Sequence, residues 1–276
     1  MSPYRGSAQL TKDWRHFRLE LDEDHIATLT FSRPDRLNAL TFEVYADLRD
    51  LLDELPQRED VRVLVMTGTG RGFCSGGDVH DIIGRLLEMG PKDLLDFTRM
   101  TGGVVEKMRG CPIPIVAAVN GVAAGAGAVI ALAADFRLLA ASATFSFLFT
   151  KVGLAGADMG SAYLLPRLVG FGRATELLML GDRLDAKRAA EFGLATAVVE
   201  DGELPVRAKE LARRLAAGPT LAYATTKLLL SRELDLNLAG ALELEAMAQA
   251  LLMKSDDHAE FYEAFKYGRD PKWSGR

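Results

Sequence analysis

The chain has 276 residues, of which 49% are hydrophobic and 26% are charged, and its formal net charge is −5 at pH 7. These values are typical of a globular protein with one sizeable domain, and the negative charge argues against nucleic acid or an anionic membrane as a partner. The two cysteines, Cys74 and Cys111, suggest neither a disulfide framework nor a metal cluster. Residues 1–18 lack an apolar leader, so we expect a cytoplasmic protein without a membrane span.

The first two thirds of the chain alternate short apolar strands with helical stretches. Residues 41–55 carry apolar side chains at helical spacing, with Thr41 as the N-cap and Pro56 after the last turn. The predicted strands span residues 17–21, 25–31, 61–67, 115–119, 137–140 and 144–149. Strands that alternate with helices predict an α/β core, which we assign to residues 1–200.

From about Gly170 onward the pattern is helical. The predicted helices span residues 173–180, 186–192, 203–217, 221–233, 238–255 and 258–266. A helical end of this size buries its apolar faces against the core or against another subunit. We therefore predict a helical C-terminal region at residues 201–276.

A first glycine-rich loop follows the strand at 61–67. Residues 71–78 read Arg-Gly-Phe-Cys-Ser-Gly-Gly-Asp, with three glycines in six residues. Such a segment lets backbone N–H groups approach a ligand closely, which is typical of an anion- or oxyanion-binding loop. A plain tight turn is the alternative.

A second glycine-rich loop follows the strand at 115–119 and leads into a helix at 128–134. Residues 120–127 read Asn-Gly-Val-Ala-Ala-Gly-Ala-Gly. The free N–H groups and the partial positive charge at a helix N-terminus suit an oxyanion. Close helix packing is the alternative, and the spacing does not fit a dinucleotide-binding fingerprint.

The two loops together resemble the crotonase (enoyl-CoA hydratase/isomerase) superfamily. Residues 73–78 match its Phe-(Ser/Cys)-(Ala/Ser)-Gly-(Gly/Ala)-Asp signature, and residues 120–127 match Asn-Gly-x-Ala-x-Gly-(Gly/Ala)-Gly. The resemblance continues at residues 33–40, 165–174 and 265–271, and so covers nearly the whole chain. It implies an α/β spiral of ββα units, a helical C-terminal region that forms a homotrimer or a hexamer (a dimer of trimers), and an acyl-CoA substrate. It implies no metal or redox cofactor, because coenzyme A is part of the substrate.

The resemblance also implies roles for individual residues. The backbone N–H groups of Ser75 and Ala126 are expected to hold the thioester oxygen, at roughly 3 kcal/mol of transition-state stabilisation per donor. Arg36 is expected either to meet the phosphates of coenzyme A or to be a solvated surface residue, and Asp78 to order its loop near the adenine end. The other expected substrate contacts are Phe73, Gly76, Gly125, Val129 and Phe149.

The sequence departs from the superfamily's hydratases at the two glutamates that deliver water and a proton. Those positions hold Val129 and Phe149 here. Neither side chain can transfer a proton, so the two-glutamate mechanism cannot operate from these positions.

Asp158 is the remaining acid/base candidate. Residues 158–167 resemble the Asp-x-Gly…Leu-Pro-Arg segment of the superfamily's isomerases, in which the aspartate shuttles a proton. Counted from Gly153 it lies one residue late, and helix N-capping is the alternative role. Apolar neighbours should raise the pKa of this carboxyl group. The phenylalanines at 145, 147 and 149 suggest a wide acyl pocket that accepts a ring, or simply core packing.

We therefore expect an enzyme that converts an enoyl-CoA through an enolate, with Asp158 as the sole acid/base in isomerisation or hydration. Two alternatives are hydrolysis or substitution with Asp158 as the nucleophile, and a non-catalytic acyl-CoA-binding subunit. His80 and Tyr163 are reserve proton-transfer groups. Cys74 is expected to be a small buried residue and not a nucleophile.

Overall fold

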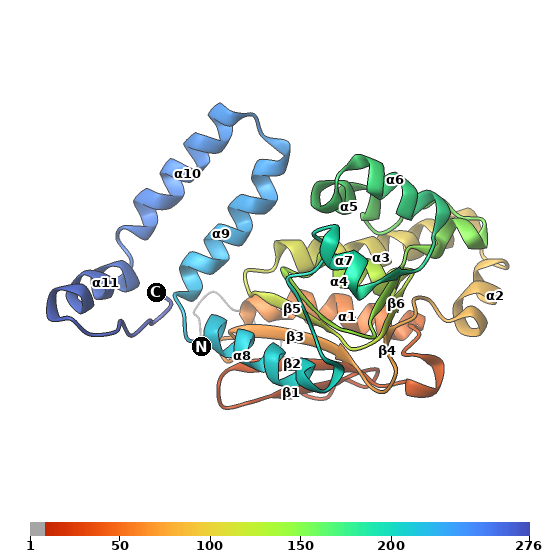
Figure 1. Ribbon diagram of the computed structural model, residues 1–276, viewed down its shortest axis with the longest axis horizontal. Helices are drawn as coiled ribbons and strands as arrows, with labels where there is room; N and C mark the ends of the chain where they lie inside the picture. Colours follow the sequence, from red (N-terminus) through yellow and green to blue (C-terminus); the bar gives the residue numbers. More distant parts are fainter. Residues whose placement is uncertain (1–8) are drawn as a thin grey trace.

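The computed structural model describes residues 9–276 (Figure 1). The strands are β1 (Arg18–Leu21), β2 (Ile26–Phe31), β3 (Val63–Gly68), β4 (Gly72–Cys74), β5 (Ile115–Val119), β6 (Val122–Ala124), β7 (Phe136–Ala140), β8 (Thr144–Ser146), β9 (Leu184–Asp185) and β10 (Ala197–Val199). The α-helices are α1 (Phe42–Glu54), α2 (Gly84–Leu86), α3 (Pro91–Gly110), α4 (Ala126–Ala133), α5 (Ser161–Val169), α6 (Phe171–Leu180), α7 (Ala186–Glu191), α8 (Leu204–Ala216), α9 (Thr220–Arg232), α10 (Leu238–Leu252) and α11 (Asp256–Tyr267).

The main sheet has six strands in the order β1-β2-β3-β5-β7-β10. Its first pair, β1 and β2, is antiparallel, and the other neighbours are parallel. Its central strand β5 is buried along its whole length, as expected for a parallel strand that is covered on both faces. Helix α8 packs against β3, β5 and β7, and α1 and α3 pack against each other.

The smaller sheet has four strands in the order β4-β6-β8-β9. The successive pairs β3–β4, β5–β6 and β7–β8 each place their first strand in the main sheet and their second strand in the smaller one. Helices follow each pair, so the chain repeats a ββα unit. This arrangement confirms the predicted α/β class and spiral.

The predicted helix at 41–55 is confirmed as α1, and Thr41 accepts a hydrogen bond from the Val44 amide at 3.4 Å as its N-cap. The predicted strand at 144–149 is wrong beyond Ser146. After Phe147 the chain enters a 3₁₀ helix, η4 (Leu148–Val152), which ends at Gly153 with φ of 80°. No helix within residues 9–276 has both the length and the apolar character needed to cross a membrane.

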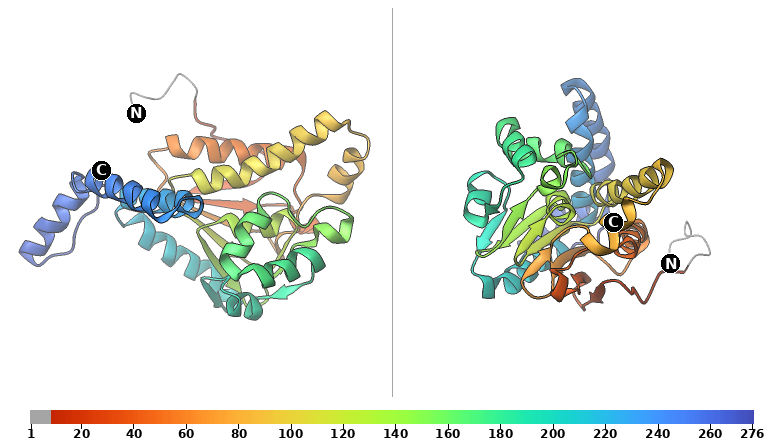
Figure 2. Two further views of the ribbon diagram at one scale, coloured as in Figure 1. Left: turned by 90° about the horizontal axis from the view of Figure 1, so that it is seen from above. Right: turned by 90° about the vertical axis from the view of Figure 1, so that its right-hand side faces the viewer.

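The last three helices, α9 to α11, form an arm that extends away from the two sheets (Figures 1 and 2). The arm is tied to the core through α9, where Lys227 forms an ion pair with Asp135 at 2.8 Å and Ser231 accepts from Arg109 at 2.9 Å. The helical C-terminal region is thus present. Helix α8, which comes after residue 200, still packs on the main sheet. The predicted domain boundary at residue 200 stays a prediction.

Candidate active site

Each glycine-rich loop contains one strand of the smaller sheet, and the chain leaves these two strands at the same end of the sheet. Strands β4 and β6 pair in parallel, with Gly72 opposite Val122 and Cys74 opposite Ala123. Because parallel strands end on the same side, the segments that follow them lie next to each other. A Cβ atom on Gly127 would overlap the Cys74 carbonyl group, so only glycine fits there.

Gly76 brings the first loop against the N-terminus of α4. Its φ of +95° lies in the left-handed region, and a Cβ atom there would lie 2.9 Å from the Ala124 oxygen and 3.3 Å from the Ala126 nitrogen. Gly125, the N-cap of α4, also has a positive φ, of 51°. These two glycines therefore permit the close approach that the sequence predicted.

The predicted role of the Ser75 amide is wrong. This N–H donates to the Leu37 carbonyl oxygen at 3.0 Å, and the Ser75 hydroxyl donates to the Arg36 carbonyl oxygen at 3.2 Å. Ser75 therefore fastens the first loop to residues 36–37, and its amide is not a free donor. No sequence pattern predicts this pairing, because it joins segments that are nearly forty residues apart.

Gly77, which the sequence reasoning did not select, carries the free amide of this loop. It bridges Leu40 in a parallel pairing, in which Leu40 donates to the Gly76 carbonyl at 2.8 Å and the Asp78 amide donates to the Leu40 carbonyl at 2.9 Å. In such a pairing the N–H of the bridged residue points away from the neighbouring segment. Within residues 9–276, neither the Gly77 amide nor the Ala126 amide, at the first position of α4, donates a hydrogen bond.

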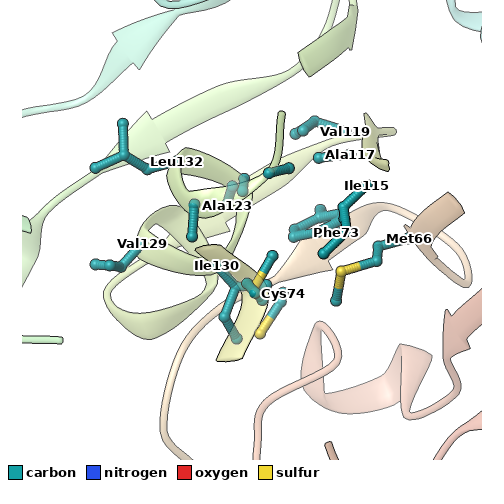
Figure 3. Close-up of a cluster of buried hydrophobic side chains, with 14 of the residues drawn as sticks. Met66, Phe73, Cys74, Ile115, Ala117, Val119, Ala123, Val129, Ile130 and Leu132 are labelled. Carbon is teal, nitrogen blue, oxygen red and sulfur yellow. The ribbon is translucent and has the colours of Figure 1, made fainter. Parts of the chain in front are cut away.

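Two of the predicted substrate contacts belong to the core. The side chains of Phe73 and Val129 are completely buried, and the Phe73 ring packs edge-on against Phe31 at 5.6 Å between centroids. Figure 3 shows both in an apolar cluster with Ile130 of α4 and Cys74 of β4. Their predicted contact with substrate is therefore corrected to a packing role beneath the two loops.

The other aromatic and cationic candidates differ in exposure. Phe149, on η4, is also mostly buried, at 7% exposure, so little of its ring can face a ligand. Arg36 ends the 3₁₀ helix η1 (Pro34–Arg36), and its side chain is exposed. The Arg36 carbonyl oxygen accepts from the Ser75 hydroxyl, so the backbone of Arg36 lies beside the first loop.

Asp78 orders the end of the first loop. Its carboxylate accepts from the amides of His80 at 3.0 Å and Asp81 at 3.2 Å, and pairs with Arg33 at 3.1 Å. Burial works against ionisation of this group, but the two amides and the Arg33 guanidinium outweigh it and lower its pKa. The loop-ordering role predicted for Asp78 is confirmed, and its carboxylate is held ionised.

Asp158 lies in a strained turn before α5. Met159 has φ of 48° and Gly160 has φ of 85°, so two consecutive residues adopt left-handed backbone conformations. Among the residues that the structure describes, the Asp158 carboxylate accepts only from the adjacent Met159 amide, at 2.9 Å. The N-cap of α5 is Gly160 without a side-chain bond, so the alternative role of Asp158 as the helix cap is wrong.

The environment of Asp158 changes its acidity. Burial is the main influence and raises the pKa of its carboxyl group, although the Met159 amide lowers it. The direction agrees with the sequence prediction. A carboxylate with a raised pKa is a better proton acceptor near neutral pH than an ordinary aspartate.

Tyr163, His80 and Cys74 have different surroundings. The Tyr163 hydroxyl donates to Asp235 of the arm at 2.8 Å, and the Arg167 guanidinium lies 3.6 Å from the Tyr163 ring centroid. The His80 side chain is exposed. Burial raises the pKa of the Cys74 thiol to about 12, which confirms it as a buried residue and not a nucleophile.

The two sheets, the ββα repeat and the paired glycine loops define the chain as a member of the crotonase superfamily. A sequence model of the family "Enoyl-CoA hydratase/isomerase" matches residues 22–276. The chain therefore belongs to the enoyl-CoA hydratase/isomerase family, and it is an enzyme of the hydratase or isomerase type.

Individual relatives agree with this assignment. The chain is 38% identical to 1,2-epoxyphenylacetyl-CoA isomerase of Escherichia coli (strain K12), over 94% of this chain and 99% of that protein. A crystal structure from Streptomyces coelicolor A3(2), provisionally assigned as an enoyl-CoA hydratase, is 60% identical with a TM-score of 0.98 and full coverage of both chains. Enoyl-CoA hydratase from Bacillus anthracis is 29% identical with a TM-score of 0.89, over 95% of this chain and 100% of that one.

Proposed function

We propose that this enzyme converts an enoyl-CoA thioester through an enolate, with Asp158 as the only carboxylate that moves the proton. The observation that carries the proposal is the half-buried Asp158 carboxylate, whose pKa is raised and which sits on a strained turn. Backbone strain of this kind clusters at functional sites. Double-bond isomerisation needs one group that removes a proton from one carbon and returns it to another, and a single aspartate can do both.

The enolate oxygen would be held by the Gly77 and Ala126 amides. Gly77 takes the role predicted for Ser75, and the role predicted for Ala126 is kept. Both are free donors, and Gly76 brings the two loops into contact. Preorganised amides that are already directed at the developing charge need no reorganisation during the reaction. The exposed guanidinium of Arg36 beside this loop would meet the phosphates of coenzyme A, and the chemistry requires no metal or redox cofactor.

A ring-bearing acyl group is the substrate class we favour. The support is the 38% identity to an isomerase named for a phenylacetyl-CoA derivative. The aromatic residues at 145, 147 and 149 do not add to it, because they are buried in the core. Hydration remains the second reaction, and substitution with Asp158 as a nucleophile the third.

We further propose that the protein acts as a homotrimer or a hexamer in the cytoplasm. The arm presents many exposed apolar side chains, and α10 has no buried residue in the single chain. Exposed apolar surface of this kind marks a protein interface. The two buried cysteines, both with free thiols, suit a reducing compartment.

A panel of linear, branched and aromatic enoyl-CoAs, analysed by mass spectrometry in deuterated water, tests the reaction. We expect the parent enzyme to form an isomer of the substrate in which deuterium has replaced hydrogen on carbon. Asp158→Asn should form no such product. A mass gain of one water would replace isomerisation by hydration. In a parallel reaction in ¹⁸O-labelled water, ¹⁸O in the Asp158 carboxylate would replace both by covalent catalysis. Tight binding without turnover by either protein would make the chain a binding subunit.

Ala126→Pro tests the oxyanion hole separately. Proline is tolerated at the first position of a helix, so this change removes the amide hydrogen while α4 can still form. We expect kcat to fall by about 10² to 10³, as for loss of one oxyanion donor. Ala126→Gly keeps the amide and serves as the control. Equal rates for the two variants would exclude the Ala126 amide from the site.

A further inference from the structure

Tyr45 of α1 places a hydroxyl group beside the first glycine loop. A Cβ atom on Gly77 would lie 3.8 Å from the Tyr45 Oη atom, so this oxygen is next to the free Gly77 amide. The ring is held by an edge-on contact with Phe97 of α3, at 6.0 Å between centroids. The tyrosine therefore reaches the loop from a fixed position.

The Tyr45 ring is buried, but its hydroxyl lacks a hydrogen-bond partner. The residue is only 3% exposed, and within residues 9–276 no hydrogen bond involves its Oη atom, which is not one of the fully buried side-chain atoms without a partner. The oxygen therefore keeps some accessible surface, through which a hydrogen-bond acceptor on a ligand can reach it. Tyrosine is also an unexpected choice here if the site needs only packing, because phenylalanine would fill the same space.

Asp158 belongs to the same cluster. Burial is the main cause that raises the pKa of Tyr45 well above its ordinary value, and the negative charges of Cys74 and Asp158, when ionised, raise it further. The phenol therefore stays protonated and can act as a hydrogen-bond donor. The turn that carries Asp158 approaches this region through Gly160, where a Cβ atom would lie 3.6 Å from Val105 of α3. Helix α3 in turn packs against α1, which carries Tyr45.

We propose that the Tyr45 hydroxyl donates a hydrogen bond to an oxygen atom on the acyl group of the substrate, and so selects acyl groups with an ether, epoxide, hydroxyl or carbonyl oxygen near the thioester. This inference rests on the proposed function, because it places the thioester oxygen on the Gly77 amide. A site with a buried donor discriminates against a ligand that leaves the donor unpaired. Tyr45 is thus a specificity-determining residue.

Binding of two matched pairs of unreactive thioesters tests the inference by calorimetry. Methoxyacetyl-CoA replaces one methylene group of butyryl-CoA by an ether oxygen, and 3-methoxypropionyl-CoA does the same to pentanoyl-CoA one atom further along the chain. We expect Tyr45→Phe to weaken binding of at least one ether by about threefold to tenfold, the range for one neutral hydrogen bond. Binding of the two hydrocarbon thioesters should change less than twofold.

Two controls separate recognition from structure. Tyr223→Phe removes a hydroxyl from a tyrosine of α9 and should leave all four affinities unchanged. Tyr45→Phe should unfold at the same temperature as the parent protein or a higher one, because its hydroxyl has no partner to lose. Equal effects on ethers and hydrocarbons, or a shift confined to the pH dependence of turnover, would overturn the inference. Failure of the parent protein to bind any of the four thioesters would instead overturn the proposed function.

Discussion

Gly76 and Gly77 are adjacent in the first loop but leave different amounts of room for a side chain. We expect Gly76→Ala to lower the unfolding temperature and the activity, because a Cβ atom would lie 2.9 Å from a backbone oxygen at φ of +95°. Left-handed backbone alone costs a residue with a Cβ atom about 1–2 kcal/mol. Gly77→Ala should be tolerated, since its Cβ atom would lie 3.7 Å from Ile82 and 3.8 Å from Tyr45. Thermal unfolding of both variants checks this, and equal unfolding temperatures would contradict it.

Ionisation of Asp158 should affect activity and stability in opposite directions. The folded protein raises the pKa of this carboxyl group, so kcat/KM should fall as the pH drops through that raised value, above the range of an ordinary aspartate. A raised acid pKa in the folded state favours the protonated form, and this contribution to stability is lost as the pH rises through the folded pKa.

Asp158→Asn therefore should lose activity by about 10² or more, yet unfold at a higher temperature than the parent protein near neutral pH. The gain should shrink toward acidic pH, where the parent carboxyl group is also neutral. Profiles of kcat/KM and of unfolding temperature against pH give both readouts. A gain in unfolding temperature that does not grow with pH would show that burial of this charge has no energetic consequence.

The residues of the site were predictable to different degrees. The glycine loops and Asp158 were found because residue type and spacing carry them in the sequence. The choice of Gly77 over Ser75 was not predictable, because it depends on which amide of the loop is hydrogen-bonded to the distant segment 37–40. Tyr45 lies in the helix predicted at residues 41–55 and is buried, but the position of its hydroxyl beside the first loop follows only from the folded structure.

At the scale of elements, helices with a clear apolar period were predicted to within a few residues. Helix α3 was not predicted, because Gly102 and Gly103 in its interior disfavour a helix, and its packing on α1, α4 and α9 compensates. The three-residue strands β4 and β6 were predicted as parts of loops. They become strands through pairing with each other, a long-range effect that local sequence does not encode.

The attachment of α9 to the core depends on the buried ion pair of Lys227 and Asp135. Both side chains are largely buried, and Lys227 also donates to the Ile113 carbonyl at 3.0 Å. We expect Lys227→Met to destabilise the protein by about 3–5 kcal/mol, because it leaves a buried carboxylate with one partner fewer. Lys209→Met breaks an exposed pair with Asp22 and should cost at most about 1 kcal/mol. Denaturant unfolding at one fixed protein concentration compares the two, and similar losses would refute a special role for Lys227.

At the scale of the whole molecule, the arm is the part whose apolar side chains stay exposed in a single chain. Leu238 and Leu251 on α10 are 75% and 77% exposed, and Met247 between them is 53% exposed. Burial of one leucine side chain contributes about 1.5–3 kcal/mol, so a helix with several exposed apolar residues gains considerably from a second copy of the chain. The arm also projects away from the sheets (Figure 1), as expected for a segment that packs against another copy of the chain.

We therefore expect sedimentation velocity to show a trimer or hexamer for the parent protein, and Leu251→Glu to shift it toward smaller species at micromolar concentration. A buried glutamate without a partner is costly, whereas the same charge on a solvent-exposed leucine has little effect. Leu87→Glu is the matched control, because Leu87 is 85% exposed but follows α2, far from the arm along the chain. An unchanged sedimentation profile for Leu251→Glu would show that this face of α10 remains in water, and the apolar residues of the arm would then need a different partner.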